Sequence, residues 1–365
     1  MRARLGDEDL LSIEADLAKI QAEIDEIAFG LYGFSEEDRA AALGSSTMIN
    51  EDGDGGAEDL EDSEDDDSSE AIDRTDSLLS WAVGVAFGRF DWRLAIGERE
   101  VPPEPEPFDP LPAKSPGMLP DGASPFHAHH GILVDDQGHP HDLPQLIEEV
   151  LVRVDVEVPS DMRRWLQRDF FPMHLKQYSK SRRKAPIYWP FSTASGSYTL
   201  WFYYPNLTTQ TLYTAVNDFI EGPNGKLSQV RRDIASLRDS AIARSRDDDR
   251  ALEALQTLEL ELIELRDLLL QIAATYRPNN GDGVQITAAP LWELFRYKPW
   301  QKVLKDTWIK LKKGDYDWAH LARAYWPERV REKCKTDRSL AIAHDLEHLY
   351  VEPEPKARSG KNADA

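Results

Sequence analysis

The stretch that decides the fold is KQYSKSRRKAPIYWPFSTASGSYTLWFYY, residues 176–204. Five cations occupy its first nine positions, and two aromatic runs, IYW and YTLWFYY, then flank a turn through Ser195 and Gly196. Aromatic runs joined by a short polar turn predict a β-hairpin over 188–204. The hairpin faces either pack as core or lie exposed beside the cations, and the pattern leaves both arrangements open.

Helical periodicity flanks this hairpin on both sides. Residues 9–32 place apolar side chains at alternating steps of three and four, which predicts an amphipathic helix that needs a partner. Residues 77–96 return to this period with Gly84 and Gly88 one turn apart, which suits close packing against another backbone. Two apolar stripes between 226 and 277 predict an antiparallel helical hairpin. The expected fold class is α+β, predominantly α-helical, with a helical hairpin and a small antiparallel β-sheet.

Shorter signals connect these elements. GILVDD at 131–136 predicts a short strand, and DLPQLIEEVLVRV begins a helix with Pro144 close to its start. Residues 161–177 have helical character, and SEED at 35–38 is typical of a helix N-cap.

Composition divides the chain into eight segments. Between 51 and 73 there are thirteen acids and no base, which predicts a disordered loop, and the proline-rich run that begins VPPEPEPFDPLP excludes a helix. The expected segments are an N-terminal helical segment (1–43), a disordered acidic loop (44–76), a packed apolar helix (77–100), a Pro-rich extended connection (101–145), a basic and aromatic α+β lobe (146–225), a helical hairpin (226–277), a Trp-rich helical region (278–350) and a disordered tail (351–365).

The charge is unevenly distributed along the 365 residues. A formal net charge of -23 argues against a polyanionic partner, but more than half of it lies in the acidic segment 51–73. Residues 162–204 instead hold eight cations against Asp169 alone, which indicates a locally basic face. The single cysteine, Cys334, and the lack of an apolar N-terminal or membrane-length run lead us to expect a cytoplasmic protein with no membrane partner.

One histidine-rich loop has the atoms of a metal site without the spacing. The residues in FHAHHGILVDDQGHPH that could act as ligands are His127, His129, His130, Asp135, Asp136, His139 and His141. They lie in a Pro/Gly-rich segment, whereas structural metal sites show tighter pairing of ligands, so a solvated loop is the favoured interpretation and we expect no metal. We also expect no catalytic residues, because no GxSxG occurs and PNNGDGV resembles neither a Walker loop nor a dinucleotide fingerprint.

The cations that precede the hairpin are the best candidates for a binding site. Ammonium and guanidinium groups beside aromatic strands suit contacts to phosphates combined with stacking on bases. The candidate DNA-binding residues are Lys176, Tyr178, Lys180, Arg182, Arg183, Lys184 and Tyr188. In the alternative arrangement the cations form a solvated rim, and the aromatic side chains that form the sheet core are Trp189, Tyr198, Trp201 and Tyr203.

A second basic run, RYKPWQKVLKDTWIKLKK at 296–313, adds to the case for nucleic acid. Its alternative is an amphipathic helix with the lysines directed outward. The residues expected to face inward in that case are Trp300, Val303, Leu304, Trp308 and Leu311.

The hairpin block, followed by TLYTAVNDFI, resembles the C-terminal region of large adenine-specific DNA methyltransferases. These are single-chain enzymes of phage-defence and restriction-modification systems, including BREX and type IIG systems. Three other blocks share the resemblance in the family's order: AEIDEIAFGLYGFSEEDR, SWAVGVAFGRFDWRLAIGER with PPEPEPFDPLP, and GDYDWAHLARAYWPERVREKCKTDRSLAIAHDLE. Together the blocks cover most of the chain outside the acidic segment.

The family's catalytic motifs are missing. Methyl transfer in these enzymes needs a glycine-containing loop that binds S-adenosylmethionine and an (Asn/Asp)-Pro-Pro-(Tyr/Phe) tetrapeptide that holds the target amino group. The adenine must be swung out of the duplex into the pocket that these two motifs form. The Pro-Pro of this chain reads VPPE at 101–104, and no matching glycine loop follows a strand. We therefore expect that the chain does not methylate alone and that S-adenosylmethionine binds a partner polypeptide.

The resemblance implies a target-recognition, DNA-binding part of a site-specific adenine-N6 methyltransferase, encoded separately or left by a split gene. Its expected partners are double-stranded DNA and a catalytic methyltransferase polypeptide, which would dock on the apolar faces of 9–32 and 77–96. In the alternative, the chain is an acidic scaffold or DNA mimic whose segment 51–73 occupies a basic groove. We prefer the first, because blocks of like charge are usually solvated loops or tails.

Overall fold

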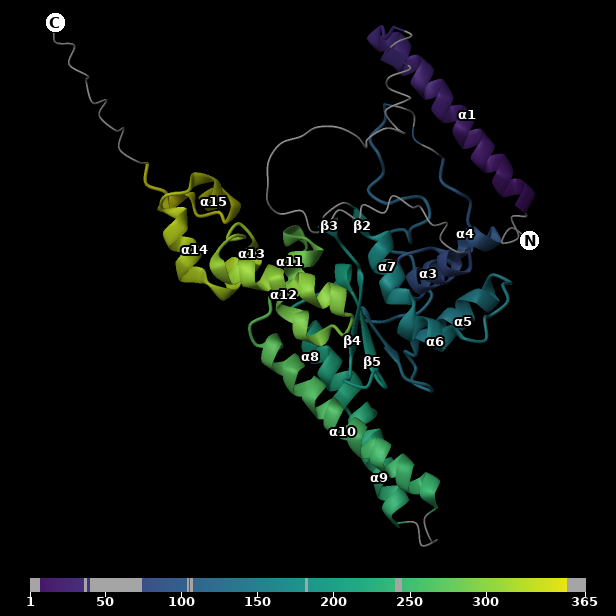
Figure 1. Cartoon of the computed structure of the whole chain (residues 1–365), viewed down its shortest axis with the longest axis vertical. Helices are drawn as coiled ribbons and strands as arrows, with labels where there is room; N and C mark the ends of the chain where they lie inside the picture. Colours follow the sequence, from purple (N-terminus) through teal and green to yellow (C-terminus); the bar gives the residue numbers. More distant parts are fainter. Residues whose placement is uncertain are drawn as a thin grey trace, which may run out of the picture.

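The structure is a computed structural model (Figure 1), and it describes residues 7–35, 38–39, 74–103, 105, 108–180, 183–239 and 245–352. The predicted acidic loop lies outside the described residues, except that its last three residues, 74–76, belong to the first turn of a helix. The predicted tail lies outside them from residue 353 onward.

A three-stranded antiparallel sheet forms the centre of the fold. Its strands are β1 (Ile132–Asp135), β5 (Thr199–Tyr203) and β4 (Tyr188–Ser192), in that spatial order. Strands β4 and β5 form the predicted hairpin, with Trp189 opposite Phe202, and Gly196 in the turn has φ +76°, a left-handed conformation that favours glycine. The predicted hairpin and the predicted strand at 131–136 are both confirmed.

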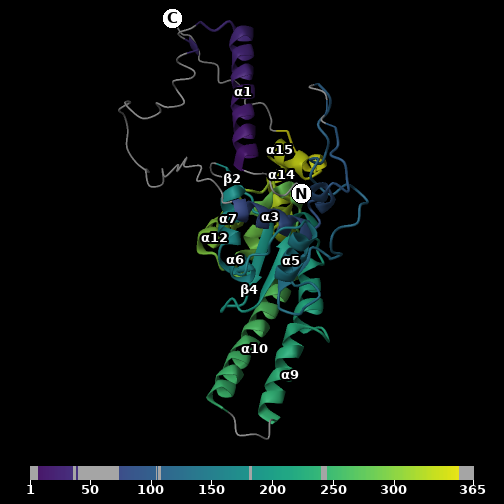
Figure 2. The ribbon, with the colours of Figure 1, turned by 90° about the vertical axis from the view of Figure 1, so that its right-hand side faces the viewer.

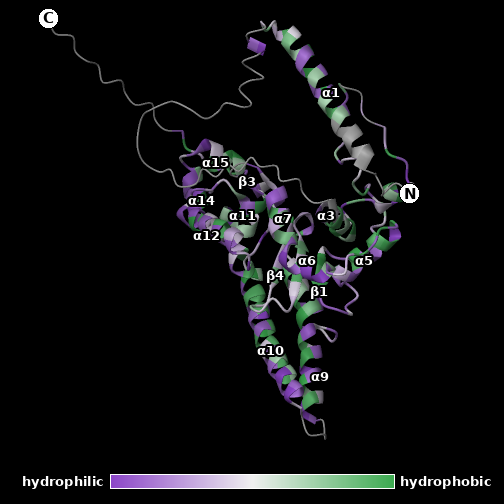
Figure 3. Cartoon of the chain, turned by 45° about the vertical axis from the view of Figure 1, so that its right-hand side comes forward, coloured by the Kyte–Doolittle hydropathy of each residue, from purple (hydrophilic) through white to green (hydrophobic). Residues whose placement is uncertain are grey.

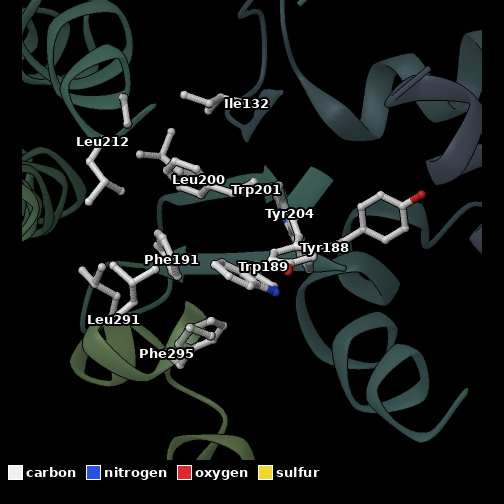
Figure 4. Packing of buried hydrophobic residues seen from close by; sticks show 14 of the residues in the cluster. Ile132, Tyr188, Trp189, Phe191, Leu200, Trp201, Tyr204, Leu212, Leu291 and Phe295 are labelled. Carbon is white, nitrogen blue, oxygen red and sulfur yellow. The ribbon is translucent and has the colours of Figure 1, made fainter. Parts of the chain in front are cut away.

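Both faces of the sheet are covered, so the aromatic hairpin is core. On one face Trp189 lies 6.0 Å from Phe295 between ring centroids, and Phe191 lies 5.1 Å from the same ring (Figure 4). On the opposite face Trp201 lies 5.4 Å from Phe170. The side chains of Trp189, Tyr198 and Trp201 are 0–2% exposed. Of the two arrangements that the sequence left open, these three residues therefore adopt the one in which they form the sheet core.

The segment before the sheet forms two short helices, α3 and α4, where one helix was predicted. Helix α3 (Arg74–Ala86) is followed by a break and by α4 (Trp92–Ile96), so the single helix predicted over 77–96 is wrong. The break has a local cause, because Gly88 adopts φ +69° and the carboxylate of Asp91 caps the next helix by accepting the Arg93 N–H. Gly84 does permit close packing, since a Cβ there would lie 2.3 Å from the Phe90 ring.

Three helices lie between β1 and the hairpin along the chain: α5 (Leu143–Arg153), α6 (Met162–Arg168) and α7 (Phe170–Gln177). Pro144 stands in the first turn of α5, as predicted. The helical stretch predicted over 161–177 is divided at Asp169 into α6 and α7.

The predicted helical hairpin is confirmed. After α8 (Thr211–Thr214) and the π-helix η2 (Ala215–Glu221), α9 (Lys226–Asp239) packs along α10 (Arg246–Ala273), and the pair projects from the sheet (Figure 2). Ser245 begins α10 with a capping box to Asp248. The buried stripes are Leu227, Val230 and Ile234 on α9 and Leu262, Leu265 and Leu269 on α10.

The C-terminal region is helical, as predicted. Its elements are η3 (Asn280–Asp282), α11 (Val284–Ala288), η4 (Ala289–Leu294), α12 (Lys298–Lys313), α13 (His320–Tyr325), α14 (Pro327–Cys334), α15 (Arg338–Ala343) and η5 (Glu347–Leu349). On α12, Trp300, Leu304 and Leu311 are fully buried while the lysines are exposed. The second basic run is therefore an amphipathic helix packed on the core.

Helix α1 (Asp7–Tyr32) stands apart from the sheet-bearing part of the molecule (Figures 1 and 3). Gly33, at φ +66°, follows its last turn, and Ser35 and Asp38 exchange the hydrogen bonds of the predicted N-cap. The expected helix over 9–32 is confirmed, but its apolar stripe remains exposed, for example Ile27 at 63%. None of the described helices is both long and apolar enough to cross a bilayer.

Candidate nucleic-acid interface

Most of the predicted DNA-binding cations lie on a two-stranded ribbon between α7 and β4. Strands β2 (Ser179–Lys180) and β3 (Arg183–Lys184) pair antiparallel, with Lys180 directly opposite Arg183. Both side chains are exposed, and Lys184 is half-buried. Like charges placed opposite each other on a ribbon repel unless an anion lies between or over them. Arg182, another of the five predicted cations, lies outside the described residues.

The three described ribbon cations lack carboxylate partners among the residues that the structure describes. No ion pair within the described ranges involves Lys180, Arg183 or Lys184, whereas some other cations of the same lobe are paired with carboxylates. Arg163, for example, bridges the buried carboxylates of Asp135 and Asp142. The ribbon therefore carries positive charge that faces solvent.

Lys176 and Tyr178 lie next to the ribbon in different settings. Lys176 is exposed in the last turn of α7 and has an interaction of its own, so it does not count among the unpaired cations. The Tyr178 hydroxyl accepts a hydrogen bond from Arg89 Nη1, and the Arg89 guanidinium carbon lies 5.5 Å from the Tyr178 ring centroid. Arg89 is half-buried and also lies over Phe90, at 4.9 Å.

Arg89 was not among the predicted site residues, and within the described chain it has no carboxylate partner. It comes from the break after α3, about ninety positions before the ribbon, so nothing in the local sequence connects it with Tyr178. Its hydrogen bond holds the Tyr178 ring in place beside the ribbon. Tyr178 remains partly exposed and keeps a place in the candidate site.

Tyr188 is buried and has no surface to offer to a base. Its side chain is 2% exposed and stacks against both Phe87, at 5.0 Å between centroids, and Tyr203, at 5.4 Å. Burial raises the pKa of the Tyr188 hydroxyl far above its usual range, so the ring stays neutral. The prediction that Tyr188 contacts DNA does not fit this burial, because strand β4 turns the ring into the core, and we leave it out of the candidate site.

His174 anchors the chain on both sides of the ribbon through two hydrogen bonds. Its Nε2 accepts hydrogen bonds from the backbone N–H groups of Ile187 at 2.9 Å and Tyr188 at 3.3 Å, which ties α7 to the start of β4. Burial, together with the nearby charge of Arg89, lowers the pKa of His174 to about 3. A neutral imidazole that accepts these bonds thus holds both ends of the ribbon.

This buried histidine predicts a loss of stability in acid. The folded-state pKa lies below the ordinary histidine value near 6.5, so the stabilisation is complete above about pH 6.5 and is lost as the pH falls toward 3. Each pH unit in this window costs about 1.4 kcal/mol for such a group. We expect chemical denaturation of His174→Gln at pH 7, 6 and 5 to show a shallower fall than wild type, while exposed His130→Gln follows wild type. Equal slopes in all three proteins would contradict the assignment.

Three histidines of the predicted loop, His127, His129 and His141, form hydrogen bonds within that loop. His127 Nε2 and His141 Nδ1 share a hydrogen bond of 2.7 Å, and His129 Nδ1 accepts the Gly131 N–H at 2.8 Å. Burial lowers the pKa of His129 to about 4 and also lowers the pKa of His141. Among the described residues no three His, Cys, Asp or Glu side chains are arranged to hold a metal ion.

The comparisons with known proteins assign no function to the candidate site. No protein-family model matches the chain, and no curated protein matches it. The resemblance to adenine-specific DNA methyltransferases therefore stays a prediction from the sequence blocks.

Proposed function

We propose that the chain is the target-recognition and DNA-binding part of a site-specific adenine-N6 DNA methyltransferase of a phage-defence or restriction-modification system, as a separate subunit or a split-gene fragment. The observation that supports DNA binding best is the β2–β3 ribbon, on which Lys180, Arg183 and Lys184 lack carboxylate partners within the described chain. Exposed cations of this kind bind backbone phosphates and release condensed counterions.

The ribbon positions DNA rather than reading its sequence. Phosphate contacts fix the register and orientation of a protein on the duplex, whereas base edges carry the sequence information. Half-exposed Tyr178, held by Arg89, is the aromatic side chain closest in sequence to these cations that keeps some accessible surface. S-adenosylmethionine and the flipped adenine would bind a catalytic polypeptide, since the motifs for both are absent from this chain.

Replacing the ribbon cations should weaken duplex binding. In Lys180→Gln/Arg183→Gln/Lys184→Gln we expect about a tenfold or greater loss of affinity for a fluorescent 20-bp duplex at low salt, because three phosphate contacts are removed. The matched control is Lys302→Gln/Lys310→Gln/Lys313→Gln, which removes the same charge from the exposed face of α12. Fluorescence anisotropy of the full chain measures both. Equal losses in the two variants would show that overall charge, and not the ribbon, governs binding.

Helix α1 is the proposed docking element for the catalytic polypeptide. Leu17, Ile20, Ile24, Ile27 and Leu31 form a stripe with the three-four spacing of a coiled-coil seam, and each is 52–79% exposed. A lone helix with such a stripe is marginal in water and gains stability by burying it. The predicted second docking face, 77–96, is wrong in its α3 part, because that helix packs its apolar side into the core.

The charges of α1 favour a basic partner helix over a second copy. Residues 7–32 hold eight acids and one base, Lys19. Glu14, Asp16 and Glu23 occupy the positions that flank the seam, so two copies would place net negative helices side by side. A partner helix with lysine or arginine along its flanks meets both the apolar and the electrostatic requirement.

This docking surface has a direct test. A synthetic heptad peptide with Leu/Ile in the seam and Lys on the flanks should bind the full chain, and Ile24→Glu/Ile27→Glu should abolish binding because two charges enter the seam. Glu26→Gln on the outer face is the control. Calorimetry measures binding and light scattering measures mass. Concentration-dependent self-association through α1, or peptide binding that survives the double substitution, would contradict the proposal.

A further inference from the structure

A cleft of about 200 Å³ lies at the opposite end of α7 from the ribbon. Its floor is the face of the sheet that carries Thr199 and Trp201, and the start of α7 forms one wall. The polar side chains that line it are Gln167, Arg168, Ser192, Thr199, Trp201, Arg296 and Tyr297, and all of them can donate hydrogen bonds. None of the described aspartates or glutamates lines it.

Trp201 lines this cleft and carries a buried donor that is unsatisfied among the described residues. The side chain is 2% exposed, and its indole N–H has no hydrogen-bond partner within the described chain. A buried N–H without an acceptor costs about 1–3 kcal/mol, so such groups are rare in folded proteins. The contrast with Trp189 is clear, because its indole donates to the Pro186 carbonyl at 2.7 Å.

Two guanidinium groups add positive charge to the rim. Arg168 is the last residue of α6, and Arg296 follows η4; both are exposed, and neither forms an ion pair with a described carboxylate. The Nε of Arg296 donates to the Ser192 carbonyl at 3.1 Å, which anchors the guanidinium over the edge strand β4. The Nη groups of Arg296 have no hydrogen bond to described residues, so they remain available to a ligand.

The carboxylate of Asp135 has both of its oxygens engaged by other side chains. Asp135 lies opposite Thr199 across the sheet, but Arg163 takes one of its oxygens and Gln167 Nε2 donates to the other at 2.6 Å. Ser192 and Thr199 share a hydrogen bond of 2.8 Å. That bond uses one hydroxyl hydrogen, and the other hydroxyl hydrogen is left to donate into the cleft.

We propose that this cleft binds a phosphate-type oxyanion through the Trp201 indole, the Ser192–Thr199 hydroxyl pair and the guanidinium groups of Arg168 and Arg296. A tetrahedral anion offers several acceptor oxygens, and charge-assisted hydrogen bonds to it are strong. The volume is below the roughly 300–1,000 Å³ of sites for larger ligands, so it suits one phosphate group and not a nucleoside. The group is either free phosphate or a backbone phosphate of DNA; the second source rests on the proposed function and the first does not.

The Trp201 indole N–H resonance of the ¹⁵N-labelled full chain reports occupancy directly. We expect a saturable shift of this resonance on titration with inorganic phosphate at constant ionic strength, while the Trp189 indole resonance stays in place. Trp201→Phe assigns the peak. Arg168→Gln and Arg296→Gln should each weaken binding about tenfold, because each removes a charge-assisted contact, whereas Arg164→Gln, on the exposed side of the same helix, should not.

A parallel titration with a short duplex separates the two sources. Saturation by orthophosphate supports a free-anion site even where duplex binding fails, and saturation by duplex alone supports a backbone-phosphate site. A resonance that moves with neither probe would overturn the proposal. A linear response that chloride reproduces, or one that both arginine variants leave unchanged, would also overturn it.

Discussion

Substitution of Arg163 by methionine should lower the free energy of unfolding by about 3 kcal/mol. Its guanidinium bridges Asp135 and Asp142, whose side chains are 4% and 2% exposed, so removal leaves two buried carboxylates without their counterion. Arg163 itself is 35% exposed, and the value is therefore at the lower end of the range for a broken buried ion pair. Urea denaturation at pH 7 measures the loss.

The loss should depend on the carboxylates. Burial raises the pKa of Asp142 even with Arg163 in place, so removal of the guanidinium makes Asp142 still easier to protonate, and the difference from wild type should shrink as the pH falls. Arg163→Met/Asp135→Asn/Asp142→Asn should recover much of the stability at pH 7. Arg164→Met, an exposed neighbour, is the matched control. A loss below about 0.5 kcal/mol in Arg163→Met would place this arginine among weak surface pairs.

Truncation of Trp189 should have the other large effect on stability. The side chain is fully buried between Phe295 and Tyr204, and its indole bonds to the Pro186 carbonyl. We expect Trp189→Ala to lower the free energy of unfolding by about 3–5 kcal/mol, because it removes the transfer energy of the ring and leaves a cavity.

Trp318→Ala supplies the comparison for Trp189→Ala. Trp318 is 46% exposed, and its truncation should cost well under half as much. Denaturation followed by far-UV circular dichroism avoids the change in tryptophan fluorescence. Similar losses in the two variants would show that this face of the hairpin is not core.

The strongest periodic signals predicted the fold. Strand β4 pairs with β5, and α9 packs along α10, so each pattern meets a partner close to it in sequence and local spacing was sufficient. The helix break after α3 was missed, because it depends on the left-handed conformation of Gly88, which an apolar period does not reveal.

The candidate site was predictable only in part. Charge density alone indicated Lys180, Arg183 and Lys184, and the structure leaves them without carboxylate partners in the described chain. Tyr188 was misplaced because a two-sided sheet buries alternate residues equally, so its pattern does not show which rings stay exposed. Arg89 reaches the ribbon from a segment about ninety positions earlier, and only the tertiary fold brings it there. His174 lies in the helix just before the ribbon, but its hydrogen bonds to the start of β4 depend on how the chain folds back.

The central claim is that the unpaired cations of the β2–β3 ribbon contact DNA phosphates, and the salt dependence of duplex binding tests it most directly. The slope of log K against log salt concentration is about −0.9 per phosphate neutralised. Lys180→Gln/Arg183→Gln/Lys184→Gln should therefore have a slope shallower than wild type by about 2–3, while the α12 triple variant keeps the wild-type slope. Identical slopes in wild type and the ribbon variant, or no duplex binding at low salt, would contradict the account.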